Sequence, residues 1–441
     1  MAITLETNNG IMTFKGKSGQ PVKEKNVLLA PLNKMISNYG LQFELLPTAE
    51  QQKVIDKTIG CARVVANDYY AVKSFLYSEY GERISQYDYR TKYYPILCEE
   101  KPWLREMHRH SVLSGVSNME DAFNRFFSGK AKYPKIVTRR NPNGQRYNSP
   151  NDHERSIRLS LKDGIPYISV PKAGKVRFIM PRGKTIESIL PDKNTHIKSI
   201  TVIHDGTGYH VSLQMETIVD LVNPIKTVNL SSIGAMDMGL KHFGIYGNKS
   251  STDYVDNPRW IRKSEKQLRR AQKKLSRKYE AAKREGRNYW EGMNYQKAKA
   301  RVVKLQKHIT NQRKDFHHKL SRLIADTYDI FVFENLNIRG LLKNHHLAKE
   351  ISSVGWYQFQ QFVSYKLQRK GGMVFKIDRF FPSSKNCSVC GYKKEDMKLN
   401  DRFWYCPNCH TLHDRDANAK ENILNEGIRL IKETGITILP A

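Results

Sequence analysis

Acidic residues and cysteines are scarce in this sequence, and long apolar runs are absent. The 441 residues hold 43 Asp and Glu against 74 Lys and Arg, which gives a formal net charge of +31. No segment approaches the roughly 18–20 consecutive apolar residues that a membrane-spanning helix needs. The first ten residues, MAITLETNNG, lack the basic start and apolar core of a secretory signal. Six cysteines are too few for a disulfide scaffold, so we expect a protein of the reducing cytoplasm without a membrane partner.

The remaining composition is that of a folded protein. Hydrophobic residues make up 39% of the chain and aromatic residues 10%, which excludes a disordered basic tail. At roughly 100–200 residues per domain, the length predicts two to four domains. An excess of positive charge this large predicts a polyanionic partner. Nucleic acid is the first candidate, ahead of an anionic membrane surface or an acidic protein.

The positive charge is concentrated in two segments. Residues 259–322 contain 22 Lys and Arg but only five Asp and Glu. Their apolar residues recur at helical spacing over 265–285 and 295–324, which predicts a helical hairpin. The second segment is free of acids and contributes Lys130, Lys132, Lys135, Arg139, Arg140 and Arg146. So few acids are available for ion pairing that we expect both segments to contact phosphates.

The hydrophobic pattern divides the chain into three parts. A capping box at Thr48 and Gln51 opens a helical region that extends to about residue 127. Short alternating runs separated by Gly and Pro over about 155–217 predict an antiparallel sheet or barrel. The part that begins near residue 224 alternates strands and helices, with strands predicted at 233–236, 243–246, 330–333 and 373–377 and helices at 356–369 and 417–430.

Four of the six cysteines form a recognisable metal-binding pattern. Cys387 and Cys390 are followed after 15 residues by Cys406 and Cys409, the spacing of a zinc ribbon with one structural Zn²⁺. Gly391 follows the first pair and suits the tight turn there. His410 occupies the equivalent position after the second pair, where it fits less well and competes with Cys409 as a possible ligand.

A few acids lie where strands end or a helix begins. Asp237 and Glu334 each end an apolar run, and Asp414 and Asp416 precede the final helix. Together they could place three carboxylates at one end of a sheet. Such a cluster is unfavourable unless divalent cations occupy it, and two Mg²⁺ ions there could support phosphodiester hydrolysis.

Four motifs in this order carry a family resemblance: AMDMGL, FENLNIRGL, the CSVC and CPNC pairs, and HDRDANAKENI. With them the chain resembles the TnpB family, RNA-guided nucleases of insertion sequences that are related to compact type V CRISPR effectors. The resemblance extends over roughly residues 40–430. It implies that the catalytic, Mg²⁺-binding acids are Asp237, Glu334 and Asp416, with Asp414 the rival for the third position. The implied zinc ligands are Cys387, Cys390, Cys406 and Cys409.

The resemblance also implies an α+β multidomain architecture in a prokaryotic protein. It places a helical recognition region at 47–127, a wedge-like β-barrel at 41–46 and 128–223, and an RNase H-like (RuvC) nuclease domain at 224–441. A zinc ribbon at 380–412 is inserted in that last domain, and residues 1–40 form an extension of unknown role. Departures from the family pattern include Lys420, which replaces a common Ala on a helix turn that we expect to be exposed.

The implied function is RNA-guided cleavage of double-stranded DNA beside a short flanking motif. A guide RNA would read the sequence by base pairing, and the protein would hold the heteroduplex in a basic channel, with one chain per guide RNA favoured. Alternatives are a compact CRISPR effector, an unguided transposase and a DNA-binding protein without cleavage. Phosphate contacts are expected from Lys130, Lys132, Lys135, Arg139, Arg140, Lys273, Lys274, Arg277 and Lys278, and base stacking from Tyr133, Tyr147, Tyr289 and Trp290.

Overall fold

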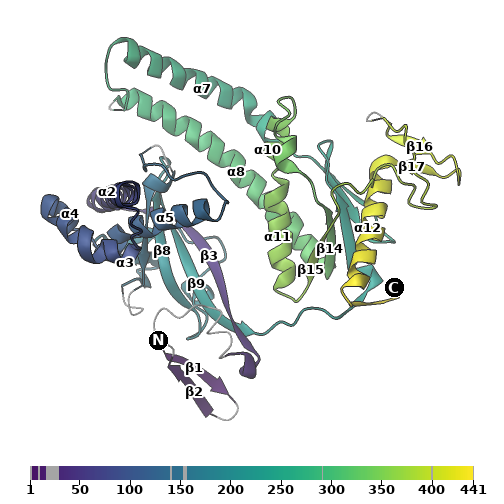
Figure 1. Ribbon diagram of the computed structural model, residues 1–441, viewed down its shortest axis with the longest axis horizontal. Coiled ribbons are helices and arrows are strands. Elements are labelled where there is room, and N and C mark those ends of the chain that lie inside the picture. Colours follow the sequence, from purple (N-terminus) through teal and green to yellow (C-terminus); the bar gives the residue numbers. More distant parts are fainter. Residues whose placement is uncertain are drawn as a thin grey trace. The chain divides into compact units, whose positions relative to one another are not determined.

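The computed structural model describes residues 2–7, 10–15, 29–139, 142–151, 156–290, 292–398 and 401–440. The chain forms two compact units, Met1–Leu221 and Val222–Ala441, and Figure 1 shows their elements. The first unit begins with an antiparallel hairpin of β1 (Ala2–Thr7) and β2 (Gly10–Lys15). Within the described residues, no helix is both long and apolar enough to cross a membrane.

The helical part of the first unit is built around two long helices. The predicted capping box is confirmed at the start of α2 (Ala49–Tyr80), where Thr48 and Gln51 hydrogen-bond each other's backbone N–H groups. Helix α5 (Arg109–Phe127) packs against α2 so closely that a Cβ on Gly115 would lie 2.1 Å from the carbonyl oxygen of Ala62. Shorter helices α3 (Gln86–Asp88) and α4 (Tyr94–Glu100) complete this part, and α4 contributes Tyr94, Leu97 and Cys98 to its core.

The remaining strands of the first unit form one seven-stranded sheet in the order β4-β8-β9-β3-β7-β6-β5. All of its neighbours pair antiparallel. The predicted closed barrel is not observed, because the outer strands β4 and β5 make no pairing with each other among the described residues. The long partners at its centre are β3 (Lys34–Leu46) and β9 (Tyr209–Asp220), and the others are β4 (Arg146–Pro150), β5 (Leu159–Lys162), β6 (Ile165–Val170), β7 (Gly174–Phe178) and β8 (His196–His204), with α6 (Ile186–Ile189) before β8.

The second unit contains a five-stranded mixed sheet in the order β13-β12-β11-β14-β15. Strands β11 (Ile233–Asp237), β14 (Ile330–Glu334) and β15 (Met373–Ile377) are parallel, and β12 (His242–Gly247) and β13 (Asp253–Asp256) continue the sheet antiparallel. Four of these strands were predicted, and β13 was not because its sequence DYVD lacks an apolar pattern. A two-stranded parallel sheet joins β10 (Thr227–Asn229) to β18 (Thr437–Leu439).

Helices cover both faces of this sheet (Figure 1). Side chains of β14 alternate between them: Phe331 and Phe333 pack with helices α8 and α11, while Ile330 and Val332 pack with α12. The predicted helices are confirmed as α11 (Trp356–Gln368) and α12 (Arg415–Glu433). Two short helices, α9 (Ile338–Leu341) and α10 (Ala348–Val354), precede α11.

The predicted helical hairpin is confirmed as α7 (Trp260–Arg284) and α8 (Met293–Thr327). Aromatic side chains pack on one another at its tip, where Tyr289 contacts Tyr279, Trp290 and Tyr295. Tyr289 and Trp290 are therefore half-buried in a local cluster. Stacking by Tyr147 is a wrong prediction, because its ring lies in the core of the first unit with 1% exposure.

Lys420 is also placed differently from the prediction. Its side chain is fully buried rather than exposed. The Nζ donates to the carbonyl oxygens of Asn248 and Ser251, both at 3.0 Å, and forms an ion pair with Glu421. The turn between β12 and β13 lies over α12, and its carbonyl oxygens accept the hydrogen bonds that the buried ammonium needs.

The close packing of α12 on the sheet gives a first prediction. A Cβ on Gly427 would lie 2.4 Å from Cγ2 of Val332 on β14, so Gly427→Ala should destabilise the second unit by about 1–3 kcal/mol through overpacking. Gly60→Ala on α2 is the matched control, since only the tip of Arg63 comes within 4 Å there. It should be neutral or stabilising by up to about 1 kcal/mol. Urea denaturation of both variants measures the difference, and equal midpoints would contradict the close packing of α12.

Candidate functional site

Two of the predicted acids lie side by side at the carboxyl ends of parallel strands. Asp237 is the last residue of β11 and Glu334 the last of β14. The pairing of Met236 with Phe333 puts these two acids next to each other. Ile233 and Ala235, and likewise Ile330 and Val332, pack toward α12, so alternation directs both carboxylates to the α12 face.

The third predicted acid, Asp416, lies in the first turn of α12. Its rival Asp414 is the N-cap of that helix, and its Oδ1 accepts hydrogen bonds from the backbone N–H groups of Asp416 and Ala417 at 2.9 and 3.0 Å. Asp414 is thus engaged in starting the helix. The Asp416 carboxylate lies close enough to Asp237 for its charge to raise the pKa of that acid.

The electrostatics connect Asp237 with both of the other acids. Burial raises the pKa of Asp237 well above its ordinary value, and the charges of Glu334 and Asp416 raise it further, against a smaller opposing effect of Arg415. Burial also raises the pKa of Glu334, while a hydrogen bond from the Ser383 hydroxyl lowers it. Both shifts mean that the ionised carboxylates are disfavoured here without a compensating cation.

Arginine side chains supply part of that compensation at Asp416. Arg402 Nη1 lies 3.2 Å from one carboxylate oxygen and Arg415 Nη2 lies 3.2 Å from the other. Neither arginine was singled out in the sequence, and neither was Ser383. Arg402 comes from the cysteine-rich insert, 14 positions away, so its proximity to Asp416 could not be read from spacing.

The four predicted cysteine ligands are brought together. Their sulfur atoms all lie within 4.8 Å of one another, and among the described residues they are the one group of three or more His, Cys, Asp or Glu placed to hold a single ion. The Sγ atoms of Cys387 and Cys409, and those of Cys390 and Cys406, are 3.5 Å apart. Thiolates about 2.3 Å from one tetrahedral ion would be separated by about 3.8 Å, so the site fits a metal.

The two cysteine pairs have the same backbone turn. Gly391 N–H donates to the carbonyl of Cys387, and His410 N–H donates to the carbonyl of Cys406, both at 2.9 Å. Gly391 and His410 both have left-handed φ values, 77° and 56°. His410 thus adopts the glycine-like conformation, is exposed, and lies outside the metal-binding group. A different histidine, His413, contacts the cluster through Nε2, 3.1 Å from Cys387 Sγ.

Two asparagines of α12 attach the cysteine cluster to the acidic site. Asn418 donates to the carbonyl of Asn386 at 2.7 Å and accepts from the backbone N–H of Ser388 at 2.9 Å. Asn422 donates to the carbonyl oxygens of Ser383 and Asn386 at 2.8 and 2.6 Å. Asn418 lies two residues after Asp416, so one helical turn holds both the acid and the insert.

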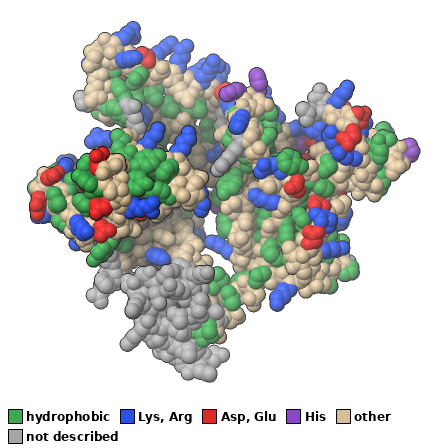
Figure 2. Space-filling view, in the orientation of Figure 1, with side chains coloured by type: hydrophobic (Ala, Val, Ile, Leu, Met, Phe, Trp, Pro, Cys, Tyr) green, Lys and Arg blue, Asp and Glu red, His purple; other side chains and the backbone are tan. Residues whose placement is uncertain are grey.

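The predicted phosphate-binding residues are on the surface. Lys273, Lys274 and Arg277 on α7 are exposed and Lys278 is half-buried. Lys274 and Lys278 line a groove between α7 and α8 together with Lys297 and Arg301. Figure 2 shows the blue side chains along this hairpin. In the first unit, Lys130, Lys132, Lys135 and Arg139 are exposed, and Arg140 lies outside the described residues.

Comparison with known proteins shows what the chain is similar to. Three family models match the chain: "Helix-turn-helix domain" at 35–82, "Probable transposase" at 210–345 and "Cas12f1-like, TNB domain" at 356–423. The chain is 29% identical to a Streptomyces pristinaespiralis protein named "Putative RNA-guided DNA endonuclease" over 88% of this chain and 89% of that protein. An Escherichia coli K12 protein with the same name and the suffix InsQ is 24% identical over 88% and 92%.

Another relative, which matches over a shorter length, and a solved structure are also similar to the chain. A Methanocaldococcus jannaschii "TnpB-like protein" is 32% identical over 31% of this chain and 32% of its own. The protein chain in "Cryo-EM structure of the Cas12f1-sgRNA-target DNA complex" superposes with a TM-score of 0.54 at 14% identity, over 90% of this chain and 99% of that one, which shows a common fold. The chain is therefore similar to TnpB-like proteins and to proteins named putative RNA-guided DNA endonucleases.

Proposed function

We propose that this protein is an RNA-guided endonuclease that hydrolyses DNA at a centre formed by Asp237, Glu334 and Asp416. The observation that carries the proposal is the placement of two acids at adjacent parallel strand ends, with the third on the first turn of the facing helix. The names of the two most fully covered relatives support RNA guidance and a DNA substrate. The match to a Cas12f1-like domain keeps a compact CRISPR effector as the alternative context.

The charges of the acidic centre favour divalent cations, although its three carboxylates are not grouped around a single ion position as the cysteines are. Asp237 is disfavoured as an anion by burial and by both neighbouring carboxylates, which is the condition that a bound cation relieves. Bound Mg²⁺ ions would supply activation of a water and stabilisation of the leaving oxygen. Asp237, Glu334 and Asp416 would hold them, and Ser383 would orient Glu334 through its hydrogen bond. Arg402 and Arg415 would exchange part of their contact with Asp416 for the phosphate.

The proposal also gives a role to each of the larger parts of the chain. We assign residues 224–441 to a nuclease domain of the RNase H-like (RuvC) type, with a structural zinc ribbon inserted at 380–412. Residues 47–127 would form the recognition region, and the sheet of 41–46 and 128–223 the wedge. The basic residues of α7 and of 130–139 would bind guide RNA and the DNA target through phosphates.

The function is tested by cleavage together with bound RNA. The full chain, expressed with the RNA that co-purifies with it, should cut a matching DNA target only with a divalent cation. Asp237→Asn should lower the rate by at least about a hundredfold, or about 2.7 kcal/mol of transition-state stabilisation, while RNA and target binding stay nearly unchanged. Asp326→Asn, which removes an exposed acid paired with Arg322, is the control and should cut normally. Full activity of the Asp237 variant would reject this centre.

A second prediction follows from the pKa of Asp237. Because its folded pKa is raised, the folded state holds the proton more tightly than the unfolded chain, and this stabilisation is lost as the pH rises through the raised pKa. Without divalent cations, Asp237→Asn should therefore unfold at a higher temperature than the wild type at pH 7–8 (on the order of a few degrees). The difference should vanish near pH 4, close to the ordinary pKa of 3.8. Adding Mg²⁺ should raise only the wild-type midpoint, and identical curves under all conditions would contradict the prediction.

A third prediction concerns zinc. The wild type should carry about one Zn²⁺ per chain, and Cys387→Ser should lose it, because three thiolates bind the ion much less tightly than four. Cys98→Ser, which alters a buried cysteine in the first unit, should retain the metal. Metal analysis of the purified variants measures this directly. Equal zinc in both variants would mean that the four sulfur atoms are not its ligands.

A further inference from the structure

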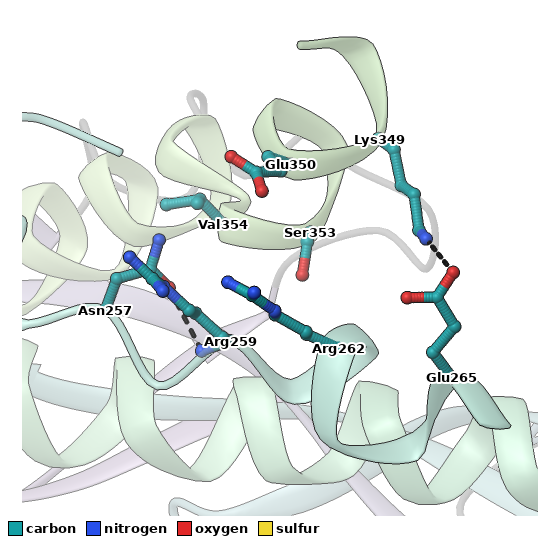
Figure 3. Close-up of a pocket in the computed structure, with 8 residues that line it drawn as sticks. All are labelled: Asn257, Arg259, Arg262, Glu265, Lys349, Glu350, Ser353 and Val354. Atoms are coloured by element: carbon teal, nitrogen blue, oxygen red, sulfur yellow. Dashed lines mark hydrogen bonds and ion pairs between the residues drawn. The ribbon is translucent and has the colours of Figure 1, made fainter. Parts of the chain in front are cut away.

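A small polar cavity lies at the base of the basic hairpin, apart from the acidic centre. Its volume is about 140 Å³, and it is lined by residues from the start of α7 and from α10. Figure 3 shows the guanidinium groups of Arg259 and Arg262 on the α7 side, beneath α10, with the ion pair of Lys349 and Glu265 at one end. None of these residues belongs to the acidic or cysteine sites.

Two of the cations that line the cavity are free to bind an anion. Among the described residues, neither the Arg259 nor the Arg262 guanidinium has a hydrogen-bonded or ion-paired partner, whereas the pKa of Glu265 is lowered chiefly by its hydrogen bond with Lys349. With Glu350, the lining has three cations and two carboxylates. The excess of one positive charge suits a phosphodiester, which carries one negative charge, better than a phosphomonoester with about −1.5 to −2.

A hydroxyl from a largely buried serine also lines this cavity. Ser353 is 9% exposed, and its Oγ has no hydrogen-bond partner among the described residues. Figure 3 shows this oxygen directed from α10 toward Arg262. A phosphate oxygen between the arginines and Ser353 would accept a hydrogen bond from this hydroxyl.

The α10 wall of the cavity is held firmly from α8. Arg313 Nη1 donates to the carbonyl oxygens of Ser352 and Ser353 at 3.0 and 3.3 Å. His317 Nε2 lies 2.9 Å from the carbonyl oxygen of Val354. The backbone that carries Ser353 is therefore fixed before any ligand arrives, which lowers the entropic cost of binding.

The surroundings indicate a strand rather than a free ion. A second cavity continues along α7 and shares Arg262 and Glu265 with the first. Its other lining residues are cations: Lys266, Arg269, Arg270 and Lys273. An isolated anion would use only the first cavity, whereas a nucleic-acid backbone entering it would place further phosphates on this row.

We propose that Arg259, Arg262 and Ser353 bind one phosphodiester of a nucleic-acid strand and so anchor that strand at the base of the α7–α8 hairpin. This inference deepens the proposed function, because it assigns a backbone contact that RNA guidance or target holding would use. The shared chemistry is the phosphodiester. Whether it comes from RNA or from DNA is decided by the experiment.

The test compares Ser353→Asp with Ser352→Asp in the full chain. Both add a carboxylate to α10, but Ser352 is exposed and does not line the cavity. Fluorescence anisotropy with EDTA measures binding of labelled single-stranded RNA and DNA of the same sequence, about 20 nucleotides long, between about 50 and 200 mM salt. Ser353→Asp should weaken binding about tenfold and reduce the salt slope by about 0.7, the value for one lost phosphate. Ser352→Asp should stay within about threefold of the wild type.

A second pair of variants tests the same proposal in case Ser353→Asp fails to fold. Arg262→Gln removes an exposed charge from the cavity and should act like Ser353→Asp, while Lys432→Gln removes an exposed charge from α12 and should not. If the cavity variants weaken binding of RNA alone, the site binds RNA, and if they weaken binding of DNA alone, it binds DNA. Weaker binding of both means that the site contacts either strand. If the wild type binds but both cavity variants match their controls, the proposal is overturned. A wild type that binds neither strand rejects the proposed function itself.

Discussion

The burial of Asp237 and Glu334 beside each other is the constraint on which the acidic centre depends. Two parallel strands with fully buried side chains, Ile233–Met236 and Ile330–Phe333, end beside each other and carry these acids on the same face. The strands cannot separate without exposing the core that both sheet faces bury. Packing of the strands therefore holds the two carboxylates together despite their mutual repulsion. Burial raises the free-energy cost of their negative charge.

The surrounding elements converge on this pair. Helix α12 brings Asp416 to the strand ends and can do so because Gly427 allows it to approach Val332. The cysteine-rich insert contributes Arg402 to Asp416 and, through the segment before it, Ser383 to Glu334. Asn418 and Asn422 fix that insert to α12. A metal ion in the cysteine cluster would thus stabilise the part of the chain that orients two of the three acids, without contacting a substrate.

Much of this arrangement could be read from the sequence, for reasons specific to each residue. Apolar runs that end in Asp237 and Glu334 mark parallel strand ends, and cysteine spacing marks a metal cluster. Lys420 could not be placed, since it follows Ala419 on a polar-looking helix and its burial depends on the turn at 248–251. The open sheet could not be told from a barrel, because alternation predicts strands but not whether β4 meets β5. Arg402, Ser383 and the cavity at Ser353 arise from contacts between distant segments.

The scarcity of acids takes on a different meaning once their positions are known. Asp237, Glu334 and Asp416 are concentrated where like charges repel, whereas the hairpin has too few acids to neutralise its cations. Each arrangement is unfavourable alone and is relieved by a different partner, metal for the acids and phosphate for the bases. A phosphodiester with divalent cations supplies both partners at once. Binding of a phosphodiester with divalent cations would therefore relieve the unfavourable electrostatic free energy of both groups of charges. A neutral ligand would relieve neither.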